Sequence, residues 1–206
     1  MTGDFADDGD LSLNSVKKKE IPFNFPSFTL NNLTVSAFNN LYYLKGRSGI
    51  TKVNYDSFFY PLDAICSWNR IYGFNGFTQY QFILPLETSY HGLEKILKKI
   101  ADSQKGSFLA VLKLYGKAND NWLSFPMEGY SLALDFKIEH GLFDLLYSLD
   151  RIVADMGGRI YLTKDVRVSE KTFEQGYPMI NRFRELRAKT GMDKKFSSLQ
   201  SRRVNI

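Results

Sequence analysis

The sequence predicts an α+β protein built around a ferredoxin-like βαββαβ sheet-and-helix domain, with a helical C-terminal segment behind it. Two observations predict this class. Between residues 78 and 165 the apolar period changes from two to 3.6 and back, and it does so twice. The order that results is strand, helix, strand, strand, helix, strand.

The first half of this unit begins with a strand at residues 79–85, in which Phe82 and Leu84 alternate with their neighbours. A helix follows, with Thr88 or Ser89 as the expected N-cap, and its apolar residues recur at helical spacing up to residue 100. Residues 108–115 form a strongly apolar second strand with one internal charge, Lys113.

The second half repeats the pattern. Residues 130–136 predict the third strand, and residues 141–156 predict a helix that ends at two glycines, 157–158. Residues 159–162 predict the fourth strand. Ser169 is expected to start a short helix, and Pro178 suits the first turn of another.

Three regions follow from this division. Residues 1–26 are expected to be a flexible tail, first acidic and then basic, with a proline-punctuated connector. Residues 27–165 form the predicted central domain, and residues 166–206 form the helical C-terminal segment.

Composition excludes several kinds of site. The single cysteine, Cys66, excludes an internal disulfide and a four-cysteine zinc site, and only two histidines are present. No apolar run is long enough to span a membrane and no signal peptide is evident, which predicts a cytoplasmic protein. The net charge of +5 fits a mildly basic soluble protein, or a surface that meets phosphate or an anionic membrane.

Polar residues interrupt the predicted strands at three places. Gln79 and Gln81 share one face of a strand, which is either solvated or part of a cleft. Lys113 is either buried with an anionic partner or extends from a sheet edge to solvent. Tyr161 and Lys164 lie where the last strand ends, a common place for function, although a surface pair of Lys164 with Asp165 is also expected.

None of these places carries a self-sufficient catalytic signature, such as a glycine-rich phosphate loop or a zinc-ligand spacing. Two aromatic clusters, residues 57–63 and 68–73, are either core packing under a long loop or one wall of a ligand cleft. The residues alone therefore predict an α+β domain with a polar-lined sheet face.

An ordered set of short motifs makes the interpretation more specific. Together these motifs resemble the C-terminal half of decaprenylphosphoryl-β-D-ribose 2'-oxidases, which are FAD-dependent oxidoreductases of the vanillyl-alcohol-oxidase type. The motifs are FYPLD (59–63), WNRIYG (68–73), QYQF (79–82), SFLAVLK (107–113), LSFP (123–126) and GGRIYLTKD (157–165).

The resemblance implies that this chain carries the substrate domain of a sugar oxidase, whose alcohol substrate loses a hydride to FAD. It implies that Lys164 is catalytic and contacts the cofactor together with Tyr161. It also implies a set of substrate-binding residues, namely Gln79, Gln81, Lys113, Ser131, Ala133, Phe59 and Arg70.

Two positions depart from the family pattern. Ser131 stands where the family has an asparagine, and Ala133 stands where it has a reactive cysteine. Ala133 keeps the space but forms no covalent adduct, so substrate contacts are expected to differ.

The resemblance also implies partners. A polyprenyl-phosphate sugar or related sugar alcohol is the expected substrate, and an epimerising reductase and the membrane surface are expected neighbours. The main FAD-binding domain is expected on a separate polypeptide, as in a truncated or split gene product. One alternative is a non-catalytic remnant that serves as a binding domain. Another is a basic nucleic-acid binder, but the placement of the Gln and Lys residues fits a pocket better than a base-stacking sheet.

Overall fold

The computed structural model describes residues 4, 18–45, 49–60, 63–107 and 109–206. Pro61, Leu62 and Phe108 of the sequence motifs lie outside the described residues. The chain divides into two compact units, Met1–Gly76 and Phe77–Ile206. Each is described by itself.

The first unit is mostly short elements. Its strands β1 (Lys19–Glu20) and β2 (Ile65–Cys66) form a parallel pair. Its helices are η1 (Ser27–Thr29), α1 (Asn32–Lys45), α2 (Tyr55–Phe59) and η2 (Trp68–Tyr72). Gly73 is the C-cap of η2. Gly73 has a φ of 77°, and a Cβ there would lie 2.7 Å from the carbonyl oxygen of Phe25.

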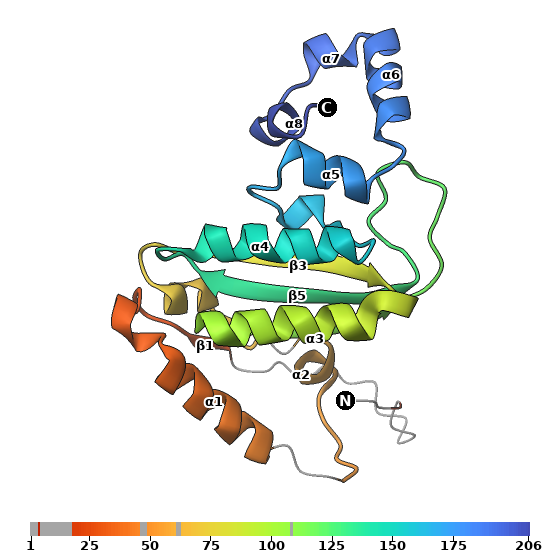
Figure 1. Ribbon diagram of the computed structural model, residues 1–206. Helices are drawn as coiled ribbons and strands as arrows, with labels where there is room; N and C mark the ends of the chain where they lie inside the picture. The colour runs from red at the N-terminus through yellow and green to blue at the C-terminus, as the bar shows by residue number, and fades with distance from the viewer. Residues whose placement is uncertain (1–3, 5–17, 46–48, 61–62, 108) are drawn as a thin grey trace. The chain divides into compact units, whose positions relative to one another are not determined.

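The second unit holds a four-stranded sheet with helices. Its strands are β3 (Phe77–Pro85), β4 (Ala110–Tyr115), β5 (Gly129–Lys137) and β6 (Arg159–Ile160), in the order β4-β5-β3-β6. Every neighbouring pair is antiparallel. Helix α3 (Leu86–Ser103) follows β3, and α4 (Leu142–Asp155) follows β5 (Figure 1). The predicted mixed class is thus confirmed, with an antiparallel sheet.

One face of the sheet forms the core. Tyr80, Phe82 and Leu84 alternate along β3 and are buried together with apolar side chains of β5, α3 and α4. Both helices carry the apolar stripe that the sequence predicts, and they lie alongside β3 and β5 in Figure 1. The opposite face carries the polar residues Gln79, Gln81 and Ser131, and it also carries the fully buried Ile83.

Two predicted boundaries are wrong. Helix α3 begins at Leu86, directly after Pro85, so the hydroxyls of Thr88 and Ser89 lie inside the first turn and donate to the Pro85 carbonyl oxygen. The fourth strand ends at Ile160, because the chain then turns into the 3₁₀ helix η3 (Leu162–Lys164).

The C-terminal segment is helical, as predicted. It comprises α5 (Glu170–Gly176), α6 (Ile180–Thr190), α7 (Met192–Lys195) and α8 (Leu199–Arg203). Ser169 caps α5 by accepting a bond of 3.2 Å from the Thr172 backbone N–H. Its core contacts are with the same unit, through the buried residues Phe173, Tyr177, Ile180 and Val204.

Among the described residues, no helix is both long enough and apolar enough to cross a membrane.

Candidate functional site

The sheet face opposite α3 and α4 gathers most of the predicted substrate-binding residues. Side chains alternate along each strand, and register therefore fixes which residues share this face. Gln79 and Gln81 come from β3, where Gln81 pairs with Ala133 of β5. In turn, Ser131 of β5 pairs with Lys113 of β4. Antiparallel pairing thus brings residues from positions 79 to 133 onto one polar surface.

Gln81 is the fixed centre of this surface. Its side chain is 7% exposed, and its amide Nε2 donates to the Ser131 hydroxyl at 3.1 Å. Ser131 is itself buried, whereas Gln79 and Ala133 are half-buried. The site therefore has a buried amide–hydroxyl pair, with more accessible neighbours on both sides for contact with a ligand.

Lys113 is exposed, so of its two expected placements the sheet-edge one is confirmed and the buried one with an anionic partner is wrong. The physical reason is its place on β4, the outer strand of the sheet, where Leu112 and Leu114 are also exposed. An apolar strand sequence does not distinguish an outer strand from a central one. Lys113 remains on the polar face, where its ammonium is free to meet an anionic group on a ligand.

Aromatic rings border the same face. The ring of Phe125, from the β4–β5 connection, stacks on Tyr161 at 4.4 Å between centroids and meets the edge of Tyr115 at 6.1 Å. Arg159 donates to the Ser124 carbonyl oxygen at 2.8 Å, which fixes this connection against β6. Tyr161 is thus held by stacking, and its backbone N–H donates to the Gln81 carbonyl oxygen at 2.9 Å.

Lys164 lies beside the two glutamines. It ends η3, is half-buried, and lines a small hollow together with Gln79, Gln81 and Arg167. The hollow has about the volume of one water molecule. Tyr80, Leu146 and Arg167 line the same hollow, so Lys164 lies near residues 78–81 of β3, while Lys113 lies on the other side of β5.

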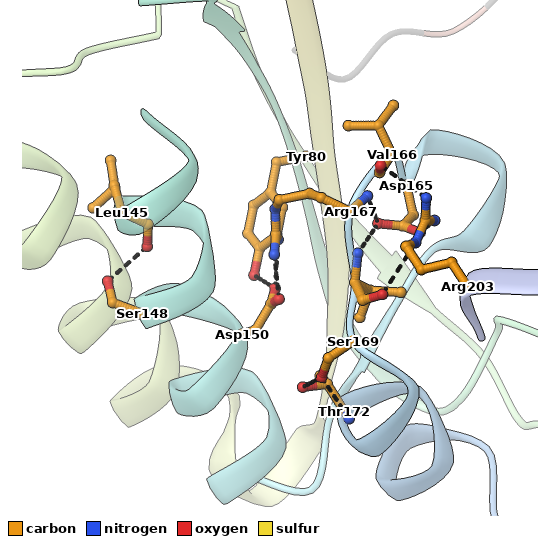
Figure 2. Close-up of polar contacts among 11 residues, drawn as sticks. Tyr80, Leu145, Ser148, Asp150, Asp165, Val166, Arg167, Ser169, Thr172 and Arg203 are labelled. Atoms are coloured by element: carbon orange, nitrogen blue, oxygen red, sulfur yellow. Dashed lines mark hydrogen bonds and ion pairs between the residues drawn. The ribbon is translucent and has the colours of Figure 1, made fainter. Parts of the chain in front are cut away.

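A buried ion pair supports the segment that follows Lys164. Arg167 donates to both carboxylate oxygens of Asp150 on α4, at 2.5 and 2.7 Å, and the Tyr80 hydroxyl donates to the same carboxylate at 3.0 Å (Figure 2). The Arg167 guanidinium also lies over the rings of Tyr80 and Tyr147, at 5.5 and 4.8 Å. These contacts fix the segment to the helical side of the sheet.

The charges in this cluster shift each other's protonation. Burial, reinforced by the Asp150 charge, raises the pKa of Tyr80 well above its usual value. Burial by itself lowers the pKa of Arg167, but the hydrogen bonds and charge of Asp150 outweigh burial and raise it. The raised pKa values keep the charge on Arg167 and the proton on the Tyr80 phenol.

Phe59 and Arg70 belong to the first unit. Phe59 ends α2 and is exposed, while Arg70 lies in η2 and donates to the backbone oxygens of Ile21 and Pro22 at 2.7 and 3.1 Å. Arg70 thus ties the connector before η1 to η2. Their placement in a substrate pocket stays a prediction.

Sequence reasoning missed the residues that support the site. Asp150 had a detectable signal, because it is a carboxylate next to the apolar stripe of α4. Arg167 had none, because its partner Asp150 lies 17 residues earlier in the sequence. Phe125 lies within the LSFP motif, but the motif does not show that its ring stacks on Tyr161.

Fold and site together define a mixed α+β domain whose sheet face opposite the two helices carries two glutamine amides, a serine hydroxyl and Lys113. Over 90% of its length this chain is similar to the decaprenylphosphoryl-beta-D-ribose oxidase of Mycolicibacterium smegmatis, with 38% identity over 187 residues. The resemblance predicted from the ordered motifs is thereby confirmed.

A second relative is an uncharacterized protein in the mprA 5' region of Streptomyces coelicolor, with 36% identity over 121 residues, or 56% of this chain. The chain spans 40% of the length of the first relative, and the match covers 33% of the second. No protein-family model matches the chain.

Proposed function

We propose that this chain is the substrate-binding part of an FAD-dependent oxidoreductase that oxidises a secondary alcohol of a sugar. The observation that carries the proposal is the 38% identity to decaprenylphosphoryl-beta-D-ribose oxidase over 90% of the chain. The polar sheet face supports it, because amides and hydroxyls suit the recognition of sugar hydroxyl groups.

In this proposal the sheet and its two helices are a ferredoxin-like unit. Supporting this, β3 and β5 are the central strands, β4 and β6 the outer ones, and α3 and α4 follow the two central strands. The arrangement places the polar side chains of β3 and β5 on the sheet face that lies opposite α3 and α4.

The side chains divide the proposed tasks. Gln79 and the Gln81–Ser131 pair bind sugar hydroxyls, and half-buried Ala133 leaves space beside Gln81. Lys113, as an exposed point charge on the same face, binds the phosphate of a polyprenyl-phosphate sugar.

Lys164 carries the chemical role in this proposal. Its ammonium stabilises negative charge that develops on the alcohol oxygen as the carbon–hydrogen bond breaks. Its position near residues 78–81 of β3 supports this, because the segment that carries Lys164 lies close to the strand of Gln79 and Gln81.

The described residues fit one edge of a flavin. Lys164 and Tyr161 offer a cation and an aromatic ring just after β6, but the hollow that Lys164 lines is far too small to enclose an isoalloxazine ring. This unit would therefore supply one wall of a flavin site, with the remainder on an FAD-binding domain. FAD, when bound, accepts the hydride from the substrate.

The test is reconstitution. The purified chain is mixed with a polypeptide that covers the rest of the Mycolicibacterium smegmatis oxidase, and flavin absorbance and dye reduction with a polyprenylphosphoryl ribose are followed. Turnover should appear only in the mixture, and Lys164→Ala should remove it. Lys98→Ala, an exposed lysine on α3, is the matched control and should leave it unchanged.

Lack of turnover in a mixture that does bind FAD would contradict the oxidase proposal and favour a binding domain without catalysis. Turnover that survives in Lys164→Ala would remove the role given to that lysine.

A further inference from the structure

The segment that carries Lys164 has regular backbone hydrogen bonds only up to Asp165. The Lys164 N–H donates to the Tyr161 carbonyl oxygen at 3.0 Å, and the Asp165 N–H donates to the Leu162 oxygen at 3.2 Å. Beyond Asp165 the chain leaves η3 and makes no regular element until α5 at Glu170. Something other than secondary structure must fix residues 165–168.

Helix α8, at the end of the sequence, supplies that fixation. Arg203 donates through Nη1 to the Val166 carbonyl oxygen at 2.8 Å and through Nε to the Val168 oxygen at 3.2 Å. Its Nη2 forms an ion pair with the Asp165 carboxylate (Figure 2). One guanidinium therefore engages three successive polar points of the segment.

Gln200 extends the contact to the other side of Lys164. Its amide Nε2 donates to the Leu162 carbonyl oxygen at 2.6 Å and lies 3.4 Å from the Asp165 oxygen. Gln200 and Arg203 are three residues apart and so lie on the same side of α8. Together they enclose Lys164 between two backbone anchors.

Asp165 completes the contact from within the segment. Its side chain is 1% exposed, and Oδ1 accepts the backbone N–H groups of Arg167 and Val168 at 2.9 and 2.7 Å while Oδ2 meets Arg203. The expected surface pair of Lys164 with Asp165 is thus wrong in one respect, because the Asp165 carboxylate is buried and taken by these donors. Removing Arg203 would leave a buried carboxylate with only its two backbone donors.

Helix α8 is itself well anchored, although it is short. Ser198 and Ser201 form a capping box at its start, and Val204 directly after it is fully buried in the core. Because α8 is anchored in this way, its contacts can restrain the position of residues 162–168.

We propose that Arg203 and Gln200 are positioning residues for Lys164, and that α8 is a clasp that sets where this lysine stands beside Gln79 and Gln81. The catalytic meaning of the clasp rests on the function proposed above, but the clasp itself does not. Arg167, bound to Asp150, holds the same segment from the α4 side, so Lys164 lies in a segment fixed at both ends.

The test measures amide hydrogen exchange of the full chain without any substrate. Arg203→Gln should raise exchange across residues 162–168 by about tenfold, while amides of β5 stay unchanged, because opening is local. The matched control is Arg202→Gln. Arg202 directly precedes Arg203 in α8, and its guanidinium donates to the Ser197 hydroxyl and not to residues 162–168. It should change exchange by less than about twofold.

Two further readouts separate positioning from general stability. The first readout is the rate at which an amine-reactive probe acylates Lys164, relative to exposed Lys98. This rate should rise in Arg203→Gln. In Arg203→Lys it should return part of the way to the original value, because lysine keeps the charge but not the forked donors of arginine. Gln200→Ala should also raise hydrogen exchange in residues 162–168, but by less than Arg203→Gln. It is the variant to measure if Arg203→Gln does not fold.

The clasp is refuted if exchange in residues 162–168 is unchanged in both variants, if β5 amides speed up equally, or if Arg202→Gln has the same effect. These outcomes do not depend on turnover. If hydrogen exchange changes as expected but reconstitution gives no turnover, the positioning role of α8 is supported and only the oxidase proposal is refuted.

Discussion

Replacing Arg167 with methionine should destabilise the second unit strongly. The change removes both hydrogen bonds to Asp150, whose side chain is 2% exposed, and leaves that carboxylate with the Tyr80 hydroxyl at 3.0 Å. Methionine keeps most of the apolar stem of arginine, so the change removes chiefly the guanidinium, including its contact with the Tyr147 ring.

The magnitude follows from the unpaired charge. Removing one member of a buried ion pair costs about 3 to 5 kcal/mol, because the remaining charge stays desolvated without its partner. Lost cation–π contact adds about 1 kcal/mol. Against a total stability of about 5 to 15 kcal/mol, this is a large fraction.

The assay is urea unfolding at pH 7 followed by far-UV circular dichroism. With a slope of about 2 kcal/mol per molar urea, the midpoint should fall by about 2 M. Arg151→Met, an exposed neighbour of Asp150 on α4, is the control and should change the free energy of unfolding by less than about 0.5 kcal/mol.

The double variant Asp150→Leu with Arg167→Met should recover most of the loss, because neither charge then remains buried. A loss below about 1 kcal/mol in Arg167→Met would refute the reasoning. So would a double variant that is less stable than the single one.

Two further predictions concern the core. Because the raised pKa of Tyr80 lets the folded phenol keep a proton that the unfolded chain releases, stability should fall as pH rises above about 10. Above about pH 10 this fall should be shallower in Tyr80→Phe by up to about 1.4 kcal/mol per pH unit, as measured by urea unfolding at a series of pH values, and an equal slope would contradict the coupling to burial and Asp150. Gly129→Ala should cost about 3 kcal/mol or more, because φ is 153° and the new Cβ would lie 1.9 Å from the Leu84 carbonyl oxygen. Gly116→Ala, which has open space around it, is the control, and equal losses at the two glycines would argue against the clash.

Much of the sheet was predictable because its signals are local. The change of apolar period from two to 3.6 places β3, α3, β5 and α4 within a few residues of their observed bounds. Strand alternation also predicts that Gln79 and Gln81 share a face, since side chains two apart in a strand point the same way.

The errors have a common physical origin in tertiary contacts. Lys113 is exposed because β4 is the outer strand, and strand order is not encoded in the strand's own residues. Asp165 is buried because Arg203, 38 residues later, folds back onto it. Long-range pairing of this kind leaves no trace in local periodicity, so the sequence located the Lys164 segment without showing what holds it.

The outer position of β4 has a consequence for handling the protein. Val111, Leu112 and Leu114 are exposed along a strand that pairs on one side only within the described sheet, and such a strand offers a template for a second copy. Lys113, between these residues, acts as a gatekeeper whose charge opposes edge-to-edge stacking. Removing its side chain to probe ligand binding would therefore also promote aggregation, and arginine, which keeps the charge, is the better substitution there.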